Sequence, residues 1–495
     1  MSDPTRLGRH DSWEGVRAVV AGFGVSGFAA ADNLTHVGAS VTALADDATP
    51  TQLEKAQLLE ILGATVHLHA GATSTLPDDV DLLVVSPGFR PDVAILEQAR
   101  ARGVPVWGEV ELAWRLRDPD TPWLCVTGTN GKTTTVRMLD GILRAAGLRS
   151  QAAGNVGLPI VEAVMDPTPY DVLAVELSSF QLHYTESLSA ESAAVLNVAE
   201  DHLDWYAGPS GMDDYAADKG RIYQRVSRAC VYNVADPVTE RLVREADVIE
   251  GARAIGFTLG TPGVGMLGVV DGILVDRAFI EQRDTSAAEL CTFADLTPPG
   301  AGGPAPHVVA NALAAAALAR AHGVSQAAVR DGLRAFRPDA HRIAVVAERD
   351  GVTWVDDSKA TNPHAAQSSL LAYDPVVWVA GGLAKGAAFD DLVQAVRGRL
   401  RGAVLLGRDR AVIAAALSRH APDVRVIEVD DGETDTQEGE MALMERVVGA
   451  AAQLAGPGDT VLLAPGCASM DQFTDYAARG DAFAAAVQAR LDGTT

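Results

Sequence analysis

Short runs of apolar residues alternate with longer segments of helical periodicity along most of the chain. In the first part, apolar runs at 16–20, 40–44 and 80–85 are each long enough for one buried strand and too short for a helix. The last third repeats this alternation, with candidate strands at 352–355, 376–380, 403–406, 424–429 and 461–463. Strands separated by helical segments predict parallel sheets with helices on their faces and binding loops at the strand ends.

The middle of the chain has the same kind of pattern. Apolar runs at 123–126, 172–175 and 193–198 predict three further strands. A helix that contains Lys219 follows the third run, and an alanine-rich helix is predicted over 311–322. The central region therefore belongs to the same α/β class as the two ends.

Three polar or flexible segments interrupt these patterns. The segment 115–122 carries two prolines and is typical of a linker, 298–306 is rich in proline and glycine, and 430–440 is an acidic stretch expected to form a solvated loop. We therefore predict an α/β protein with three domains in series: a Rossmann-like domain over 1–118, a central P-loop ATPase-type domain over 119–338, and a second Rossmann-like domain over 339–495.

Composition excludes several classes of protein. The net charge of −25 over 495 residues leaves no basic surplus for non-specific binding to nucleic acid or to an anionic membrane. The four cysteines form no Cys-x-x-Cys pair, which is typical of a reducing compartment. No apolar run reaches the roughly 18 residues that a membrane span needs. We expect a soluble cytoplasmic protein.

The strongest chemical motif follows the apolar run at 123–126. Gly128 and Gly131 form a turn that leads into Lys132, Thr133 and a helical pattern. Such a turn directs backbone N–H groups inward, the helix N-terminus adds positive potential, and the lysine reaches the distal phosphates of a nucleotide. Thr133 is placed to bind the Mg²⁺ that accompanies a triphosphate. The two glycines enclose two residues instead of the usual four, so a tight structural turn is the alternative.

Other polar groups stand at strand ends. Glu176 follows a buried strand, where a carboxylate is costly unless it is paired or bound to a metal. His202 follows the next strand. Its role could equally be structural or a contact with a metal ion or a phosphate. In the last third, Lys359, Lys385 and the loop over 463–473 follow three strands. We expect these loops to gather at one edge of the sheet and to bind anionic ligands.

The first apolar run leads into Gly22-x-Gly24-x-x-Gly27, with an acidic residue about twenty positions further on. This is the dinucleotide pattern, so an NAD site must be considered. The same turn could hold the pyrophosphate of a nucleotide-diphosphate sugar, or serve only to pack a helix on a strand.

Taken together, these motifs resemble the Mur ligase family. The resemblance rests on residues 127–134, 176–181, 197–204, 357–362 and the loop that ends at Phe473, and it covers nearly the whole chain. The Asp-Ser-Lys-Ala-Thr-Asn sequence of 357–362 is similar to the members that add D-glutamate. The Asp-Asn-Pro-Arg signature of the diaminopimelate-adding members is absent.

The resemblance implies an ATP-dependent amide ligase that adds D-glutamate to UDP-N-acetylmuramoyl-L-alanine through an acyl phosphate. That step belongs to cytoplasmic peptidoglycan precursor synthesis and serves cell wall formation, cell shape and division. The implied cofactors are ATP and two Mg²⁺ ions, with Lys219 carried as its carbamate, since an ammonium cannot bind a cation whereas a carbamate offers oxygen. We expect a monomer that binds neither nucleic acid nor membrane.

The site residues that the resemblance implies fall into four groups. Those near the UDP substrate are Val25, Ser26, Asp46, Ser86, Gly88, Asn155 and Gln181. Those that contact ATP are Gly128, Thr129, Asn130, Gly131, Lys132, Thr133, Thr134, Asn311, Arg342, Asp357 and Lys359. Those that hold D-glutamate are Thr361, Lys385, Ser469 and the main chain near Tyr476. The metal ligands are Thr133, Glu176, His202 and Lys219, and the catalytic residues are Lys132, His202 and Lys219.

Two departures from the family pattern stand out. Val308 occupies the place of the first asparagine in the family's His-Asn-x-x-Asn segment, and either Asp46 or Asp47 takes the uracil-side position. Three alternative functions remain open: a related ligase for another amino acid, such as a folylpolyglutamate synthase; an NAD-dependent dehydrogenase; and a non-catalytic nucleotide switch. The last two leave part of the motif set unexplained.

Overall fold

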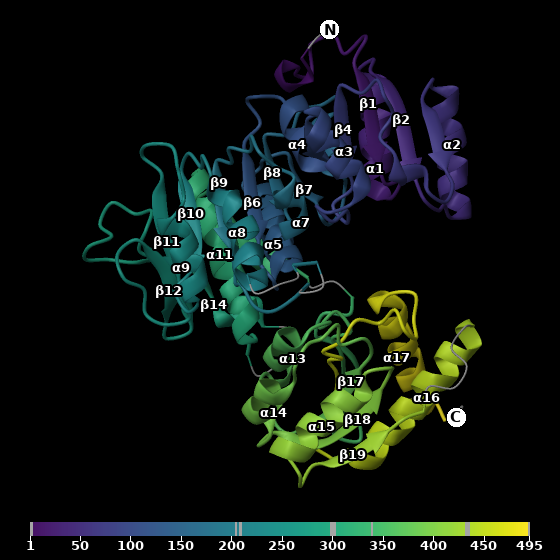
Figure 1. The fold of residues 1–495 in the computed structure, drawn as a ribbon. Helices are drawn as coiled ribbons and strands as arrows, with labels where there is room; N and C mark the ends of the chain where they lie inside the picture. The colour runs from purple at the N-terminus through teal and green to yellow at the C-terminus, as the bar shows by residue number, and fades with distance from the viewer. Residues whose placement is uncertain are drawn as a thin grey trace. The chain divides into compact units, whose positions relative to one another are not determined.

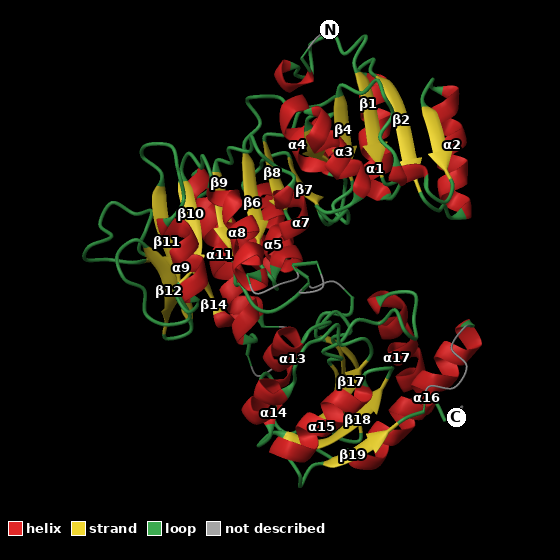
Figure 2. Cartoon of the chain, in the orientation of Figure 1, coloured by secondary structure: helices red, strands yellow, loops and turns green. Residues whose placement is uncertain are grey.

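The computed structural model describes residues 3–202, 205–206, 210–297, 303–337, 340–430 and 436–493. The chain divides into two compact units. The first consists of residues 1–198, 210–304 and 308–336, and the second consists of 199–209, 305–307 and 337–495. The first unit contains two sheets and the second contains one (Figures 1 and 2).

The N-terminal sheet of the first unit is entirely parallel and has the order β3-β2-β1-β4-β5. Its strands are β1 (Arg17–Ala21), β2 (Ser40–Ala45), β3 (Thr65–Leu68), β4 (Leu82–Val85) and β5 (Val106–Gly108). Its helices are α1 (Val25–His36), α2 (Pro50–Ile61), α3 (Ala94–Arg102) and α4 (Glu109–Leu116). The strand order reverses between β1 and β4, which is where ligands bind in open α/β sheets.

The second sheet of this unit has nine strands in the order β14-β13-β12-β11-β10-β9-β6-β8-β7. The strands are β6 (Trp123–Thr127), β7 (Ser150–Gly154), β8 (Val172–Glu176), β9 (Ser192–Val195), β10 (Ala229–Asn233), β11 (Arg253–Phe257), β12 (Met266–Val270), β13 (Ile273–Asp276) and β14 (Ala288–Thr292). The helices are α5 (Lys132–Ala145), α6 (Ile160–Val164), α7 (Ser179–His183), α8 (Gly211–Gly220), α9 (Pro237–Arg244), α10 (Phe293–Leu296), α11 (Pro306–His322) and α12 (Gln326–Ala335). Only β13 pairs antiparallel with its neighbours, so β6 lies in the parallel part between β8 and β9.

The sheet of the second unit has the order β15-β16-β20-β17-β18-β19, and only β15 is antiparallel. The strands are β15 (Ala344–Arg349), β16 (Val352–Asp356), β17 (Val376–Gly381), β18 (Leu400–Leu406), β19 (Arg425–Glu428) and β20 (Thr460–Leu463). The helices are α13 (Pro363–Leu370), α14 (Asp390–Val396), α15 (Arg410–His420), α16 (Gln437–Leu454) and α17 (Tyr476–Leu491). Because β16, β20 and β17 are neighbours, the loops that follow them leave the same edge of the sheet.

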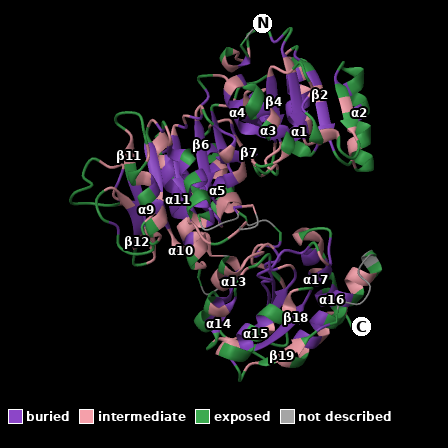
Figure 3. Ribbon diagram, in the orientation of Figure 1, coloured by how far each residue is buried: buried purple, intermediate pink, exposed green. Residues whose placement is uncertain are grey.

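The central strands are buried along their full length, whereas the outer faces of the helices are exposed (Figure 3). This is the pattern of parallel strands covered on both faces. The two sheets of the first unit share a core in which the Trp114 and Trp123 rings meet edge to face, 4.9 Å apart. Among the described residues, none of the helices combines the length and the apolar composition needed to cross a membrane.

The structure confirms the predicted strands to within a few residues but corrects three segments. The predicted linker 115–122 begins inside α4, and its Thr121 is buried. Helix α11 begins at Pro306, inside the predicted flexible insertion, whose residues 298–302 lie outside the described part of the chain. The acidic segment was expected to be a loop up to Glu440, but α16 begins at Gln437, and residues 431–435 are not described.

Candidate active site

The turn after β6 is built from two glycines in conformations that favour glycine. Gly128 has a φ of 153° and Gly131 a φ of 86°. A Cβ on Gly131 would lie 2.4 Å from Oδ1 of Asn311, so a side chain there would collide with α11. Gly131 caps α5, and Lys132 is its first residue. The first N–H groups of a helix have no acceptor within it, so Lys132, Thr133 and Thr134 stand where an anion is favoured.

Asn197, just after β9, fixes the shape of this turn. Its backbone oxygen accepts from the N–H of Thr129 at 3.0 Å, and its Oδ1 accepts from the N–H of Asn130 at 2.9 Å. Its Nδ2 donates back to the carbonyl of Asn130 at 3.1 Å. The hydroxyl of Thr129 lies 3.1 Å from that of Tyr215 on α8. The turn is therefore held by its neighbours in a fixed conformation.

Two lysines meet at one carbonyl of the turn. Nζ of Lys132 donates to the oxygens of Gly128 and Thr129, each at 2.9 Å, and Nζ of Lys219 donates to Gly128 at 3.0 Å. Lys219 is only 2% exposed, and its Nζ lies 4.3 Å from the centre of the Tyr215 ring. The structure thus brings two of the three predicted catalytic residues together at the phosphate turn.

Glu176 ends β8 beside this turn and has the properties of a metal ligand. The residue is 1% exposed, and its Oε1 accepts from Nδ2 of Asn155 at 2.9 Å. Its Oε2 is buried and has no hydrogen-bond partner among the described residues. A buried carboxylate oxygen without a partner is costly, and a bound cation would remove that cost. Oxygen donors such as Glu176 and the Thr133 hydroxyl are the ligands that Mg²⁺ prefers.

The predicted substrate residues of the N-terminal sheet lie at its switch point or close to it. Val25 and Ser26 begin α1 directly after β1, and Ser86 and Gly88 follow β4. Oγ of Ser86 is buried and has no hydrogen-bond partner among the described residues. A Cβ on Gly22 would lie only 2.4 Å from this oxygen. The glycine turn is thus packed tightly against the Ser86 hydroxyl, and the role of this turn toward a pyrophosphate stays a prediction.

Asp46, at the end of β2, is engaged by the next loop. Its carboxylate accepts from the hydroxyl and the N–H of Thr73, and these bonds lower the pKa of Asp46. Gln181 is also occupied, because its Oε1 accepts from the N–H and the hydroxyl of Ser178 and so caps α7. The roles of both residues toward the substrate stay predictions.

Glu109 and Glu111 on α4 connect the first sheet to the central sheet. Oε1 of Glu109 accepts from the N–H of Val161 at 2.7 Å, at the start of α6. Glu111 accepts from the N–H groups of Glu186 and Ser187, each at 2.8 Å, and from the Ser187 hydroxyl at 2.6 Å. These contacts fix the loops that carry Asn155 and Gln181 relative to the N-terminal sheet.

In the second unit, the loops after β16, β17 and β20 are joined to one another. The N–H of Gly466 donates to the carbonyl of Ala360 at 2.8 Å. Leu383 and Ala468 exchange two backbone hydrogen bonds of 2.9 and 3.0 Å. The structure thus gathers the loops that carry the predicted D-glutamate residues, which are Thr361, Lys385 and Ser469. Lys385 has a φ of 50°, and such strained backbone is common at binding loops.

The predicted nucleotide residues of this unit differ in their surroundings. Asp357 is buried and accepts a hydrogen bond from the hydroxyl of Ser369. Burial raises its pKa to about 6, opposed by Ser369 and by the charge of Arg342. Nζ of Lys359 lies 3.7 Å from the centre of the Tyr476 ring. Burial and Arg342 also lower the pKa of His307 to about 4.

His202 belongs to the second unit, so it is described apart from Glu176 and Lys219. It has a φ of 56°, and its N–H donates to Oδ1 of Asp201 at 2.9 Å. Residues 203 and 204 of its motif lie outside the described residues. In the described part of the chain, no cluster of three His, Cys, Asp or Glu side chains suits a metal ion. The predicted metal ligands include Thr133 and Lys219, which are not among these four residue types.

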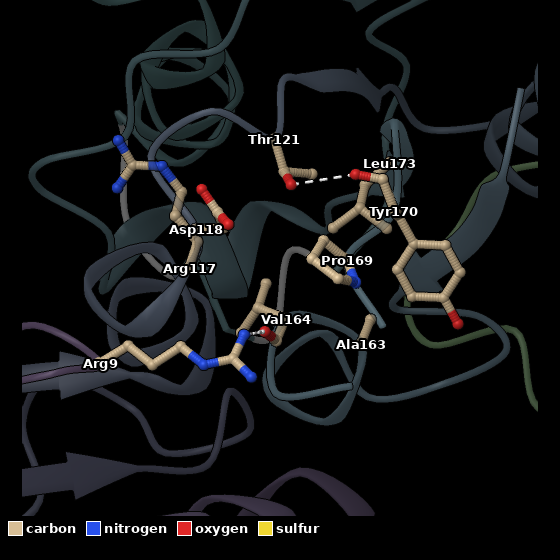
Figure 4. Close-up of a pocket in the computed structure, with 9 residues that line it drawn as sticks. All are labelled: Arg9, Arg117, Asp118, Thr121, Ala163, Val164, Pro169, Tyr170 and Leu173. Carbon is tan, nitrogen blue, oxygen red and sulfur yellow. Dashed lines mark hydrogen bonds between the residues drawn. The ribbon is translucent and has the colours of Figure 1, made fainter. Parts of the chain in front are cut away.

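A small cavity lies away from these groups, between the N-terminal segment, residues 117–121 and the segment after α6 (Figure 4). Its volume is about 10 Å³, which is room for one water molecule. Nη1 of Arg9 donates to the carbonyl of Val164 at 2.7 Å, and the Thr121 hydroxyl donates to the backbone carbonyl of Tyr170 at 3.0 Å. No predicted site residue lines the cavity, and its polar groups bond to the protein itself.

The sequence reasoning assigned no role to Asn197, Tyr215, Glu109 or Glu111. Asn197 had a signal, since it is a polar residue near the end of the apolar run 193–198. Tyr215, Glu109 and Glu111 had none, because each lies in a helix where exposed polar residues are common. Their burial depends on packing in the folded chain, for Tyr215 against the phosphate turn and for Glu109 and Glu111 against the central domain.

Comparison with known families matches three domain types in order along the chain. Residues 16–108 match the Mur ligase MurD-like N-terminal domain, 126–319 match the Mur ligase middle domain, and 341–467 match the Mur ligase glutamate ligase domain. The matches confirm three domains in series. The predicted boundaries at 118/119 and 338/339 stay predictions, and residues 338 and 339 lie outside the described residues.

Curated relatives are similar over nearly their full length. A protein of Streptomyces avermitilis named UDP-N-acetylmuramoylalanine--D-glutamate ligase is 60% identical over 478 residues, which cover 96% of this chain and 99% of that protein. A protein of Thermobifida fusca with the same name is 52% identical over 477 residues, which cover 96% and 98%.

Solved structures show the same fold at low sequence identity. The UDP-N-acetylmuramate-alanine ligase MurC from Thermotoga maritima aligns with a TM-score of 0.54 at 18% identity, covering 97% of this chain and 100% of that one. A pseudomurein peptide ligase type C from Methanothermus fervidus aligns with a TM-score of 0.55 at 16% identity, covering 91% and 96%. These likenesses confirm the α/β architecture.

Proposed function

The chain belongs to the Mur ligase family, and we propose that it adds D-glutamate to UDP-N-acetylmuramoyl-L-alanine at the expense of ATP. The observation that carries this proposal is the convergence of Lys132 and Lys219 on Gly128, beside the unpaired oxygen of Glu176. The names of the relatives support the choice of substrates. The step belongs to peptidoglycan precursor synthesis, which takes place in the cytoplasm.

The alanyl carboxylate must first be activated, because a carboxylate is a poor electrophile and its oxygen a poor leaving group. The γ-phosphoryl group of ATP passes to a carboxylate oxygen and gives an acyl phosphate. The amine of D-glutamate then attacks the carbonyl carbon, the new C–N bond forms, and the C–O bond to phosphate breaks. The amine loses its proton, and the products are an amide, phosphate and ADP.

The chain supports these steps mainly by positioning and by charge. The N-terminal turn and Ser86 hold the UDP part of the substrate, and Asn155 and Gln181 hold the muramoyl-alanine end. The phosphate turn binds the β- and γ-phosphates, whose oxygens replace the carbonyl groups that Lys132 now contacts. Lys132 then neutralises the charge that develops on the transferred phosphoryl group.

Glu176 and Thr133 are the residues that would hold a Mg²⁺ ion, and His202 with the carbamate of Lys219 would hold a second. Bound Mg²⁺ supplies positive charge at the phosphate oxygens. Lys219 is 2% exposed, and such a buried lysine suits carbamylation. The ammonium loses a proton, the neutral amine adds CO₂ and releases a second proton, and the carbamate that results offers oxygen to a metal ion. The proposal also assigns the remaining ATP contacts to four residues, which are Asn311, Arg342, Asp357 and Lys359.

The test is phosphate release from ATP and Mg²⁺ with UDP-N-acetylmuramoyl-L-alanine, comparing D-glutamate, L-glutamate and no amino acid. We expect release only with D-glutamate, and a loss of roughly a hundredfold or more in Lys132→Ala. Lys55→Ala is the matched control, because Lys55 is the one lysine that no part of the proposed site uses. Release with another amino acid would keep the chemistry and change the substrate, and no release under any condition would refute the ligase.

A further inference from the structure

Arg479 on α17 is a buried arginine whose donors are all engaged by the protein. The residue is 1% exposed. Its Nε donates to the Ser358 hydroxyl at 2.9 Å, and its Nη2 donates to the Ser358 carbonyl at 2.9 Å. Nη1 donates to the carbonyls of Gly381 and Cys467 at 3.4 and 3.2 Å, and Nη2 also reaches Cys467 at 3.2 Å.

The three acceptor residues belong to three different segments at one edge of the sheet. Ser358 lies in the loop after β16, Gly381 ends β17, and Cys467 lies in the loop after β20. We call these segments, 357–362, 381–386 and 464–473, the loop cluster. The loop cluster carries every residue predicted to contact D-glutamate except Tyr476. Ser358 also reaches that residue, because its hydroxyl donates to the carbonyl of Tyr476 at 2.7 Å.

The position of the guanidinium is fixed by its neighbour on the helix. A Cβ on Gly480 would lie 2.1 Å from Nδ1 of His341 and 2.7 Å from Oδ2 of Asp356. Helix α17 therefore approaches the end of β16 as closely as the backbone allows. A planar fork with five donors is what allows one side chain to bind three loops at once, and a lysine cannot reproduce this geometry.

The guanidinium also places a positive charge beneath the loop cluster. Its five described hydrogen bonds go to carbonyl and hydroxyl oxygens, and none goes to a carboxylate. Burial lowers the pKa of Arg479 to about 10, so the group stays protonated at neutral pH. Asp356 and Asp471 act on it only through space. A buried cation that makes no direct hydrogen bond to a carboxylate favours an anionic ligand on the loops around it.

We propose that Arg479 is a positioning residue for D-glutamate, which holds the three segments of the loop cluster in the arrangement that binds the dicarboxylate. The proposal rests on the proposed ligase function, since it takes D-glutamate as the amino-acid substrate. Arg479 acts through Ser358 and through the main chain of the loops.

The test measures KM for each of the three substrates in Arg479→Lys and Ser358→Ala. We expect KM for D-glutamate to rise on the order of 10- to 100-fold in Arg479→Lys, because a small misplacement of binding groups has effects of this size. Ser358→Ala removes one acceptor and should raise the same KM by less. KM for the UDP substrate should change by less than about threefold in both variants. KM for ATP should rise by less than KM for D-glutamate, because only segment 357–362 of the loop cluster carries residues assigned to the nucleotide. If Arg479→Lys fails to fold, the KM values of Ser358→Ala test the proposal by themselves.

Arg320→Lys is the matched control for the loss of a buried arginine. Arg320 has a side chain that is 10% exposed, and it donates to Asp276 at 2.9 Å and to the carbonyl of Val324, far from the loop cluster in sequence. Its substitution should lower the melting temperature without a selective change in KM for D-glutamate. Amide hydrogen exchange should show faster exchange in 357–362, 381–386 and 464–473 of Arg479→Lys, with unchanged exchange in β18.

The outcomes separate the two proposals. Equal changes in all three KM values, or a lower melting temperature with an unchanged KM for D-glutamate, would overturn the positioning role and leave the ligase intact. A wild-type protein that shows no D-glutamate-dependent phosphate release would overturn the ligase, and the role of Arg479 toward D-glutamate would fall with it.

Discussion

Glu109 and Glu111 stand two positions apart at the start of α4 and have opposite electrostatic surroundings. Glu109 is buried, its Oε2 has no partner among the described residues, and burial raises its pKa to about 7. Burial alone would also raise the pKa of Glu111, but hydrogen bonds from Ser187, Glu186 and Arg115 outweigh it and leave that pKa below its ordinary value. The pair therefore predicts opposite effects of pH on stability at one place in the fold.

The size of the Glu109 effect follows from its pKa. A carboxyl group with a pKa of 4.5 in the unfolded chain and about 7 in the folded one binds more protons when folded. Its contribution to the free energy of unfolding is fully present below pH 4.5 and is lost as the pH rises through 7. The full difference is about 3 kcal/mol. Between roughly pH 5.5 and pH 8 the loss amounts to about 2 kcal/mol.

Glu109→Gln should remove this dependence. Glutamine keeps the acceptor for the N–H of Val161 and carries no ionisable proton. Urea unfolding, followed through the buried tryptophans 107, 114 and 123, gives the free energy of unfolding of this part of the chain. We expect the stability of the variant relative to the wild type to rise by about 2 kcal/mol from pH 5.5 to pH 8.

Glu111→Gln is the matched control, because it lies one half-turn away on the same helix. It removes a carboxylate with lowered pKa, whose stabilisation is present above the ordinary pKa and is lost as the pH falls. We therefore expect Glu111→Gln to be destabilised most at high pH and least in acid, the opposite trend to Glu109→Gln. If the relative stability of Glu109→Gln is the same at both pH values, Glu109 does not titrate in this range and the reasoning is wrong.

Three further predictions concern the rest of the site. Glu176→Gln should raise the Mg²⁺ concentration needed for half-maximal activity by about 10- to 100-fold with little change in melting temperature, and an unchanged Mg²⁺ titration would contradict its metal role. Gly27→Ala places a Cβ 2.0 Å from the carbonyl of Gly22 and should weaken binding of the UDP substrate in calorimetry. In the control Gly24→Ala, the added Cβ has no atom within 4 Å, so this variant should bind the UDP substrate normally. All four cysteines are buried, so thiol reagents should label the native protein slowly and the unfolded protein fully.

The sequence was sufficient to predict the buried apolar strands such as β1, β6, β8 and β17, because in a parallel sheet nearly every position of such a strand is apolar. Segments that depend on packing were predicted less well. Gln437–Glu440 looks like a solvated loop in composition, yet it forms the first turn of α16, where acids are favoured by the helix dipole. Strands β3, β5, β7 and β10 to β15 were not predicted, and those among them that are short or of mixed polarity, such as β3, β5 and β14, carry a weak signal.

The candidate site was predictable where chemistry is local and unpredictable where it depends on burial. The phosphate turn, Glu176 and the loop cluster each stand directly after an apolar strand, so the order of strands placed them. Arg479 carries no such signal, because it lies in the first turn of α17 and an arginine in a helix is usually exposed. Its burial depends on the close approach of Gly480 to β16, which only the folded chain shows.

One further signal in the sequence agrees with the proposed site. Of the forty basic residues, five are lysines, and four of these are Lys132, Lys219, Lys359 and Lys385. Arginine provides the positive charge almost everywhere else, including the half-buried Arg320 and the buried Arg479, where its planar fork binds several acceptors at once. A lysine has a compact ammonium that can move between carbonyl groups and a phosphate, and its primary amine can take up CO₂. Four of the five lysines therefore stand at positions proposed to contact phosphate, D-glutamate or a metal ion, and Lys55 on α2 is the exception.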